Sequence, residues 1–189
     1  MESWQRLGYQ LLPEYAPKDI IEEIIEISNL EHRYTRGEVG PDGFSTMNKN
    51  IRSVDLINLD CYEHPDIYGM LKHVIEVFNA RYLCYNISGI NQIDLLRYGV
   101  GGHYIYHDDV FAEPTPTDRK ISCILQLSDP SDYEGGDFVL EGEDIDDHHT
   151  KMRRAKGSIV LFDSRLSHRI SPVTSGERKS LIAWGVGRV

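Results

Sequence analysis

The stretch that decides the fold is Tyr98-Gly-Val-Gly-Gly-His-Tyr-Ile-Tyr-His107-Asp-Asp109. His107 and Asp109 are two positions apart, and on a β-strand such residues point to the same face. The glycines before them allow the chain to turn tightly into this strand. The stretch therefore predicts a strand that presents an imidazole and a carboxylate side by side, as two ligands for one ion.

A third ligand and a separate cation follow toward the C-terminus. His168 lies 61 residues after His107, and Arg178 follows His168 by ten residues. Two histidines and one carboxylate that leave coordination positions open are typical of non-heme Fe(II) oxygenases. Arg178 offers a guanidinium fork that fits a carboxylate. We expect a metal site of His107, Asp109 and His168, with an anion bound nearby by Arg178.

The turn before Arg178 gives a geometric reason to place it beside His168. Thr174-Ser175-Gly176 is typical of a three-residue hairpin loop with glycine in the left-handed position. In that hairpin His168 would lie opposite Ile182, and His168 and Arg178 would share one face. No acid on the strand of Arg178 has the parity to pair with it, so an inward guanidinium predicts an anionic ligand.

Two helices and a series of short strands are predicted around these motifs. Apolar residues at helical spacing predict helices over 17–29 and 65–82, with a long loop over 35–50 between them. After Gly89 we expect strands near 91–98, 103–109, 120–128, 136–141, 148–154, 157–163, 168–173 and 177–187. The expected fold is α+β, with a sandwich or small barrel over 89–189 and helical support over 1–88 that covers one sheet.

Length and charge restrict the class of protein. A chain of 189 residues suits one domain over 1–189. The net charge of −10, with −17 over residues 1–150 and +7 over 151–189, disfavours a nucleic-acid partner. No apolar run reaches the roughly 20 residues that span a bilayer, and the first residues lack a signal-peptide profile. We therefore expect a cytoplasmic protein without membrane association.

Cysteines and the remaining histidines do not suggest a second site. Cys61, Cys84 and Cys123 are too widely spaced for a metal motif or a disulfide framework, and we expect reduced, buried thiols. His148-His149 follows Asp144, Asp146 and Asp147, but adjacent residues of a strand face opposite ways. We interpret this acidic segment as solvated.

Three segments of the chain resemble a known family. Over 98–109, 119–140 and 157–184 the sequence is similar to the prolyl-4-hydroxylase-like 2-oxoglutarate- and Fe(II)-dependent dioxygenases. The family pattern YxxGxxYxxHxD is matched by Tyr98, Gly101, Tyr104, His107 and Asp109. The stretch 127–137 most resembles the bacterial PKHD-type hydroxylases, and 168–180 matches the distal histidine, the PVxxG turn and the basic cosubstrate-binding residue of the family.

The resemblance implies a double-stranded β-helix, or jelly roll, with Fe(II) in its open end bound by His107, Asp109 and His168. Arg178 would bind the distal carboxylate of 2-oxoglutarate with help from Ser180, and Tyr98 would lie near the metal-bound end. Animal relatives have a cosubstrate-binding tyrosine on the third core strand, where this chain has Gln126. An amide could still donate a hydrogen bond there.

The implied reaction uses 2-oxoglutarate and O2 to hydroxylate an unactivated C–H bond, with release of succinate and CO2. A role for ascorbate stays open, as does the choice between monomer and homodimer. The resemblance favours a prolyl residue of a peptide or protein as substrate, selected by the loop over 35–53. A free amino acid, another small molecule, a nucleobase, or a jelly-roll module without catalysis are the alternatives. The acidic charge argues against a nucleobase, and the complete ligand set argues against a binding module.

Overall fold

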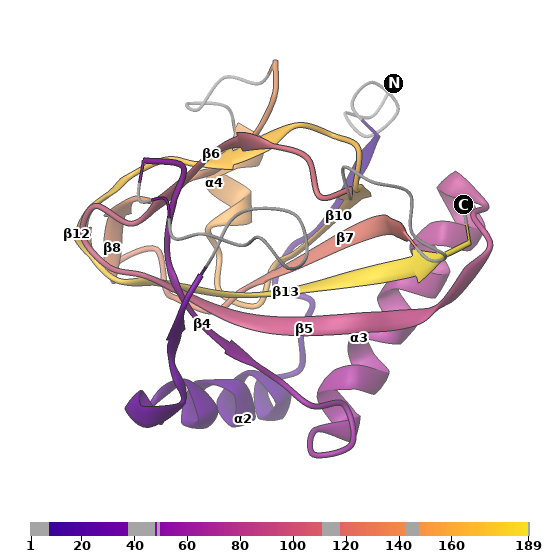
Figure 1. The fold of residues 1–189 in the computed structure, drawn as a ribbon, viewed down its shortest axis with the longest axis horizontal. Coiled ribbons are helices and arrows are strands. Elements are labelled where there is room, and N and C mark those ends of the chain that lie inside the picture. The colour runs from indigo at the N-terminus through magenta and orange to yellow at the C-terminus, as the bar shows by residue number, and fades with distance from the viewer. Residues whose placement is uncertain (1–7, 38–47, 49, 111–117, 143–147, 189) are drawn as a thin grey trace.

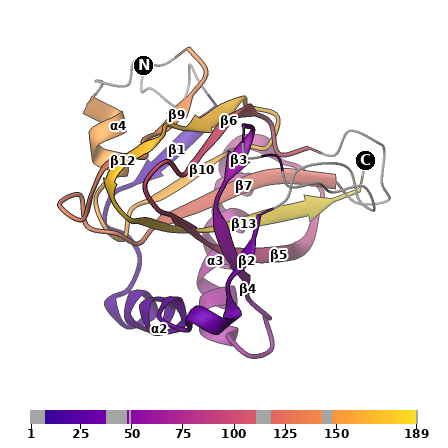
Figure 2. The ribbon, with the colours of Figure 1, turned by 60° about the vertical axis from the view of Figure 1, so that its left-hand side comes forward.

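The computed structural model describes residues 8–37, 48, 50–110, 118–142 and 148–188. Two β-sheets lie face to face, and two helices cover the outer face of the larger sheet (Figure 1). The same layering of helices, large sheet and small sheet is visible after a turn of 60° (Figure 2). This is the sandwiched α+β architecture that the sequence predicts.

The large sheet has seven antiparallel strands in the order β1-β10-β7-β13-β5-β4-β2. Its centre is β13, which pairs with β5 on one side and β7 on the other. The strands are β1 (Tyr9–Leu12), β2 (Thr35–Arg36), β4 (Asp55–Asn58), β5 (Ile87–Tyr98), β7 (Asp118–Gln126), β10 (Ile159–Asp163) and β13 (Arg178–Gly187).

The small sheet has four strands in the order β3-β6-β11-β9, and a two-stranded ribbon of β12 and β8 lies beside it. The small-sheet strands are β3 (Arg52–Ser53), β6 (His103–His107), β9 (Phe138–Leu140) and β11 (His168–Ile170); the ribbon strands are β8 (Tyr133–Gly135) and β12 (Val173–Gly176). Residue His168 of β11 lies opposite His107 of β6 in the register. The small sheet therefore brings together the two histidines that the sequence singles out.

The helices bury apolar stripes against the large sheet. Helix α2 (Lys18–Ser28) buries Ile20, Ile21, Ile24 and Ile27, and α3 (Pro65–Phe78) buries Ile67, Leu71, Val74, Ile75 and Phe78. Proline at the first position of α3 suits a helix start, because that N–H has no intrahelical acceptor. These side chains pack on the outward-facing residues of β5, β7, β10 and β13. None of the helices within the described residues is long and apolar enough to cross a membrane.

Shorter helical segments complete the chain: a 3-10 turn over Glu31–Arg33, a π-helical turn over Asn79–Leu83, and α4 (His148–Arg153). The predicted strand over 148–154 is therefore wrong. This segment is rich in straight-chain Lys, Met and Arg residues and has no alternation of apolar side chains, so a helical turn suits it better. Asp144, Asp146 and Asp147 lie outside the described residues.

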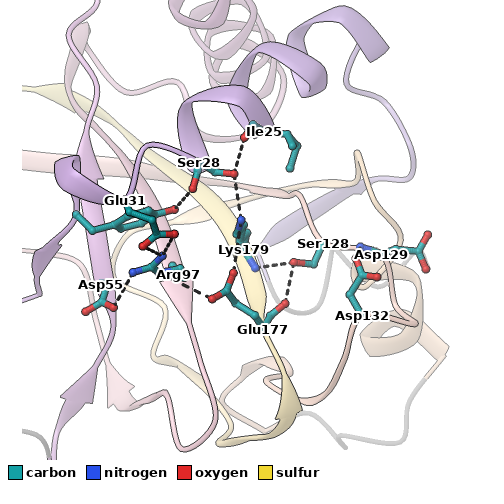
Figure 3. Close-up of polar contacts among 11 residues, drawn as sticks. Ile25, Ser28, Glu31, Asp55, Arg97, Ser128, Asp129, Asp132, Glu177 and Lys179 are labelled. Atoms are coloured by element: carbon teal, nitrogen blue, oxygen red, sulfur yellow. Dashed lines mark hydrogen bonds and ion pairs between the residues drawn. The ribbon is translucent and has the colours of Figure 1, made fainter.

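Charged side chains fasten the N-terminal elements to the outer face of the large sheet. Arg97 of β5 contacts Glu31 at 2.7 Å and Asp55 at 3.3 Å, and Lys179 of β13 contacts Ser28 at the end of α2 at 3.2 Å (Figure 3). Glu177 lies within 4.0 Å of both cations. This network leaves Tyr98 and Arg178, the neighbours of these residues, on the opposite face of their strands.

The predicted hairpin between residues 168 and 187 is wrong, although Gly176 does adopt a positive φ of 73°. Strand β11 pairs with β6 and β9 in the small sheet, whereas β13 lies in the large sheet. Between them β12 pairs with β8. His168 and Arg178 thus come from different sheets, because the chain crosses from one sheet to the other instead of folding back on itself.

The N-terminal part also differs from its predicted helical role. The described residues between 8 and 58 contribute β1, β2, β3 and β4, of which β1 and β4 pair with β10 and β5. These segments are short and lack a period-two pattern, so their strand conformation follows from the partners that the sheet offers. Of the predicted loop over 35–50, residues 38–47 and 49 lie outside the described residues.

Candidate functional site

The three predicted ligands form one cluster. His107 ends β6, Asp109 follows two residues later, and His168 begins β11. One potential ligand atom from each lies within 4.8 Å of the others, and this is the only such group among the residues that the structure describes. Asp109 and His168 are buried, and His107 is partly buried. The pleat predicted the proximity of His107 and Asp109, and the pairing of β6 with β11 adds His168.

Backbone carbonyls fix the tautomer of both histidines. His107 Nδ1 lies 2.8 Å from the Ile105 carbonyl oxygen, and His168 Nδ1 lies 2.9 Å from that of Leu166. A carbonyl only accepts, so each Nδ1 carries the proton and each Nε2 keeps its lone pair. The two Nε2 atoms lie 3.8 and 3.7 Å from the oxygens of Asp109. Both imidazoles are therefore prepared to bind a metal through Nε2.

Two serines orient the carboxylate. Ser122 Oγ of β7 donates to Asp109 Oδ2 at 2.6 Å and lies 2.9 Å from Ser164 Oγ. The Asp109 backbone N–H donates to the Ser164 carbonyl at 2.9 Å. Neither serine is among the site residues predicted from the sequence. The parity of β7 could have indicated Ser122, because it shares the inward face with Gln126.

The electrostatics keep the cluster in its metal-binding form. Burial and, after it, the neighbouring His168 lower the pKa of His107 to about 4, against the opposing effect of Asp109. Burial alone would raise the pKa of Asp109, but His168, His107 and the Ser122 hydrogen bond outweigh it and hold this pKa below its usual value. At neutral pH His107 is uncharged and Asp109 is ionised, as metal ligation requires.

Aromatic rings surround the imidazoles. Tyr104 stacks on His107 with ring centroids 3.4 Å apart, and Phe162 meets His168 edge-on at 4.8 Å. Phe138 approaches His168 from another side at 5.5 Å. These rings limit rotation of the ligands and keep water from one side of the cluster. The imidazoles are thus packed between aromatic rings, and Asp109 and His168 are buried.

Arg178 and Ser180 lie on the inner face of β13, with 3% and 1% of their surface exposed. Arg178 Nη1 donates to Ser180 Oγ at 3.1 Å, and the guanidinium carbon lies 5.6 Å from the ring centre of Tyr98. Within the described part of the chain, no carboxylate lies within ion-pair distance of Arg178. A buried guanidinium with a hydroxyl as its partner is costly, and an anionic ligand would relieve that cost.

Tyr98 is also buried, on β5 opposite Arg178 in the register. Burial raises the pKa of its phenol, so the hydroxyl stays protonated and able to donate a hydrogen bond. The glycine turn that follows fixes the start of β6: Gly101 N–H donates to the Val173 carbonyl at 2.8 Å, and Val173 N–H donates to the Gly102 carbonyl at 2.9 Å. A Cβ on Gly102 would lie 2.7 Å from the Gly99 oxygen, so only glycine fits there.

Gln126 lies on β7 opposite Ser180 in the register, on the inner face beside Arg178. Its Nε2 lies 3.2 Å from the Ser128 carbonyl oxygen and 3.1 Å from the Tyr133 hydroxyl. Tyr133 was not among the residues predicted for the site. It sits in β8, which has no apolar periodicity that could have pointed to an inward ring. All the predicted site residues therefore line the interior, and Ser122, Ser164 and Tyr133 join them.

The donor set fits the metal that the sequence suggests. Two imidazole nitrogens and one carboxylate are the protein donor set of non-heme Fe(II) sites that keep coordination positions open for other ligands. His107 is neutral and Asp109 is ionised at neutral pH, and the carbonyl contact at His168 Nδ1 leaves its Nε2 facing the cluster.

Sequence comparisons relate the chain to oxygenases that use Fe(II) and 2-oxoglutarate. Residues 93–185 match the model of the 2OG-Fe(II) oxygenase superfamily. A PKHD-type hydroxylase of Parvibaculum lavamentivorans is 40% identical over 94 residues, which cover 49% of this chain and 41% of the relative. A PKHD-type hydroxylase of Sphingopyxis alaskensis is 36% identical over 93 residues, which cover 48% and 41%. The match thus spans about two fifths of the length of these curated relatives.

Solved structures resemble the chain over nearly its whole length. A prolyl-4-hydroxylase from Pseudomonas putida has a TM-score of 0.71 at 18% identity. The match covers 98% of this chain and 96% of that protein chain. A prolyl hydroxylase from Trichoplax adhaerens, in complex with a hypoxia inducible factor peptide fragment, has a TM-score of 0.72 at 18% identity and covers 96% and 84%. At such identities the likeness concerns the fold. The jelly-roll fold and the resemblance to the prolyl-4-hydroxylase-like, PKHD-type oxygenases are confirmed.

Proposed function

We propose that this chain is an Fe(II)- and 2-oxoglutarate-dependent dioxygenase that hydroxylates an unactivated C–H bond, with a prolyl residue of a peptide or protein as its substrate. The observation that carries the proposal is the pairing of two features inside one jelly roll. A His-Asp-His cluster has its donor atoms ready for a metal, and a buried arginine has no carboxylate partner among the described residues. A 2-oxo acid with a second carboxylate could occupy both.

Each residue has a separate task in this proposal. His107, Asp109 and His168 would hold Fe(II), and Ser122 would keep the Asp109 carboxylate in place. Arg178 and Ser180 would bind the distal carboxylate of 2-oxoglutarate, and the Tyr98 phenol would donate near its metal-bound end. When bound, Fe(II), 2-oxoglutarate and O2 would supply the oxidising chemistry that inserts one oxygen atom into a C–H bond and yields succinate and CO2. The rings of Tyr104, Phe138 and Phe162 would keep water away from that chemistry.

The substrate part of the proposal is supported by likeness. The Trichoplax adhaerens neighbour is described as bound to a peptide fragment, and the Pseudomonas putida neighbour is a prolyl-4-hydroxylase. Jelly rolls of one fold act on different substrates, so the substrate has to be measured. A free amino acid or another small molecule is the alternative for the same site.

Binding and turnover test the chemistry in one preparation. Under anaerobic conditions Fe(II) and 2-oxoglutarate should together give a weak visible charge-transfer band, and O2 should then release succinate. The variants His107→Ala and Asp109→Ala should lose both signals. Asp108→Ala is the matched control, because Asp108 is the exposed neighbour of Asp109. If wild-type protein shows neither signal, or if both ligand variants keep them, the proposal fails.

A second experiment addresses the substrate. Proline-containing peptides, free amino acids and other small molecules are incubated with the protein, Fe(II), 2-oxoglutarate and O2, and products are scored by mass for a gain of one oxygen. Hydroxylation of peptidyl proline that depends on Asp109 is the expected result. Oxidation of small molecules alone would replace the prolyl substrate by the alternative and leave the dioxygenase chemistry intact.

A further inference from the structure

Besides Tyr98, a second buried tyrosine, Tyr133, belongs to the group of polar residues around Arg178. Gln126, Tyr133, Arg178 and Ser180 come from three different strands, and between 1% and 3% of the surface of each is exposed. Buried polar groups are normally hydrogen-bonded within the protein. The hydrogen bonds of this cluster therefore show which of its donors still needs an acceptor.

The orientation of the Gln126 amide is fixed by its neighbours. Its Nε2 faces the Ser128 carbonyl oxygen at 3.2 Å, and a carbonyl can only accept. The amide nitrogen therefore also faces Tyr133 and donates to the phenolic oxygen at 3.1 Å. Because Tyr133 accepts this hydrogen bond, its own O–H is left to donate elsewhere. Within the described residues it has no acceptor.

Tyr133 and Arg178 pack against the same glycine. A Cβ placed on Gly136, which has a φ of 63°, would lie 3.3 Å from Tyr133 Cδ2 and 3.2 Å from Arg178 Cδ. Any side chain at this position would crowd both the ring and the arginine stem. Gly136 thus lets Tyr133 and Arg178 pack on the same side of one backbone position.

Arg154 holds the Tyr133 ring in place. The Arg154 guanidinium stacks on the Tyr133 ring at 4.1 Å. Arg154 also donates to the Tyr133 carbonyl at 2.9 Å and to Asp137 at 2.6 Å. A preorganised donor of this kind binds an anion without losing much side-chain freedom.

We propose that Tyr133 is a cosubstrate-binding residue: its O–H donates to the same distal carboxylate that Arg178 binds, and Gln126 is the positioning residue that directs this proton. Both amide hydrogens of Gln126 already face protein oxygens, so its remaining free atom is an acceptor and unsuited to a carboxylate. The inference rests on the proposed function, since it assumes that Arg178 binds 2-oxoglutarate.

The test measures binding with and without the distal carboxylate. Isothermal titration calorimetry follows 2-oxoglutarate, and separately 2-oxobutyrate, binding to the full chain loaded with Mn(II), which avoids turnover. Tyr133→Phe removes one hydroxyl and should weaken 2-oxoglutarate about 10- to 100-fold, as expected for a hydrogen bond to a charged group. It should leave 2-oxobutyrate, which lacks the distal carboxylate, unchanged. General loosening of the site would weaken both ligands together.

Two further variants complete the design. Gln126→Met removes the donor that positions the phenol and should weaken 2-oxoglutarate by a smaller factor, again without an effect on 2-oxobutyrate. It also provides the test if Tyr133→Phe does not fold. Tyr34→Phe is the matched control, because the Tyr34 hydroxyl donates to the Ser28 carbonyl on the outer side of the sheet.

The outcomes separate the two proposals. If wild-type protein does not bind 2-oxoglutarate, the proposed function fails. If it does, and Arg178→Gln weakens binding while Tyr133→Phe binds as the wild type does, the inference about Tyr133 is wrong and the proposed function stands. Equal weakening of both ligands by Tyr133→Phe would also overturn the inference.

Discussion

The two faces of the large sheet are built from alternate residues of the same strands, yet they differ in kind. The outer face packs on α2 and α3 through aliphatic and aromatic side chains and the Cys123 thiol. The inner face mixes Leu96, Ile124 and Ile182 with buried Arg178, Gln126 and Ser122. The outer face stabilises the fold, whereas the inner face places polar groups where burial is costly. Among the described residues the inner face thus keeps a buried guanidinium without a carboxylate partner, and apolar packing on both faces offsets its cost.

The largest expected effect comes from removing one of the proposed metal ligands, which the small-sheet side contributes to the interior. Asp109→Ala should lower Fe(II) affinity by at least about 1,000-fold, because two imidazoles alone leave the charge of the ion uncompensated. Calorimetric titration with Fe(II) under nitrogen measures this. Asp108→Ala, at the exposed neighbouring position, is the control. Unchanged Fe(II) affinity would show that the cluster is not the metal site.

A substitution on the outer side of the large sheet should lower the free energy of unfolding and leave the Fe(II) affinity unchanged. Ile24→Ala in α2 leaves a cavity where a fully buried side chain stood, and we expect a loss of about 2–5 kcal/mol in the free energy of unfolding. Fe(II) affinity of the folded protein should stay as in the wild type. Chemical denaturation measures the first and titration the second. Val77→Ala removes a half-exposed side chain from α3 and should change the unfolding free energy by less than about 0.5 kcal/mol.

Arg178→Met tests whether a buried charge on the inner face lowers the free energy of unfolding while it enables 2-oxoglutarate binding. Without its anion, the buried guanidinium costs more than a thioether of similar length, so we expect the unfolding free energy of the free protein to rise by about 1–3 kcal/mol. The variant should no longer bind 2-oxoglutarate. Denaturation is compared with and without 2-oxoglutarate and Mn(II), since only the wild type should gain stability from them. A destabilised variant would mean that Arg178 has a structural role.

The smallest effect concerns the orientation of one carboxylate. Ser122→Ala removes the hydrogen bond to Asp109 Oδ2 and should lower Fe(II) affinity by about 10-fold, the lower end of what such supporting bonds contribute. Ser88→Ala is the control, because the Ser88 hydroxyl donates to the Val186 carbonyl away from the cluster. Equal affinities in both variants would show that the Asp109 backbone bond to Ser164 suffices for orientation.

Much of the site could be predicted from local patterns. The spacing of two predicted that His107 and Asp109 lie together, which is confirmed although β6 ends at His107 and Asp109 follows it. Strand parity places Arg178, Ser180, Ile182 and Trp184 on one face. Helix α2 and helix α3 follow from apolar residues at helical spacing. Where no period exists, prediction failed: 148–154 is a helix, and β1 and β4 are strands that only their partners reveal.

The sequence by itself determined which residue types could form the metal cluster, because His107 and Asp109 are close along the chain and their side chains are ligand types. It also determined that Arg178 would point inward without an acid on its own strand. Only the tertiary structure decided how His168 reaches the others, through pairing of β11 with β6 instead of a hairpin with β13. The same is true of Ser122, Ser164 and Tyr133, whose contacts join strands far apart in the chain. Such contacts depend on strand order and sheet packing, and no local spacing encodes them.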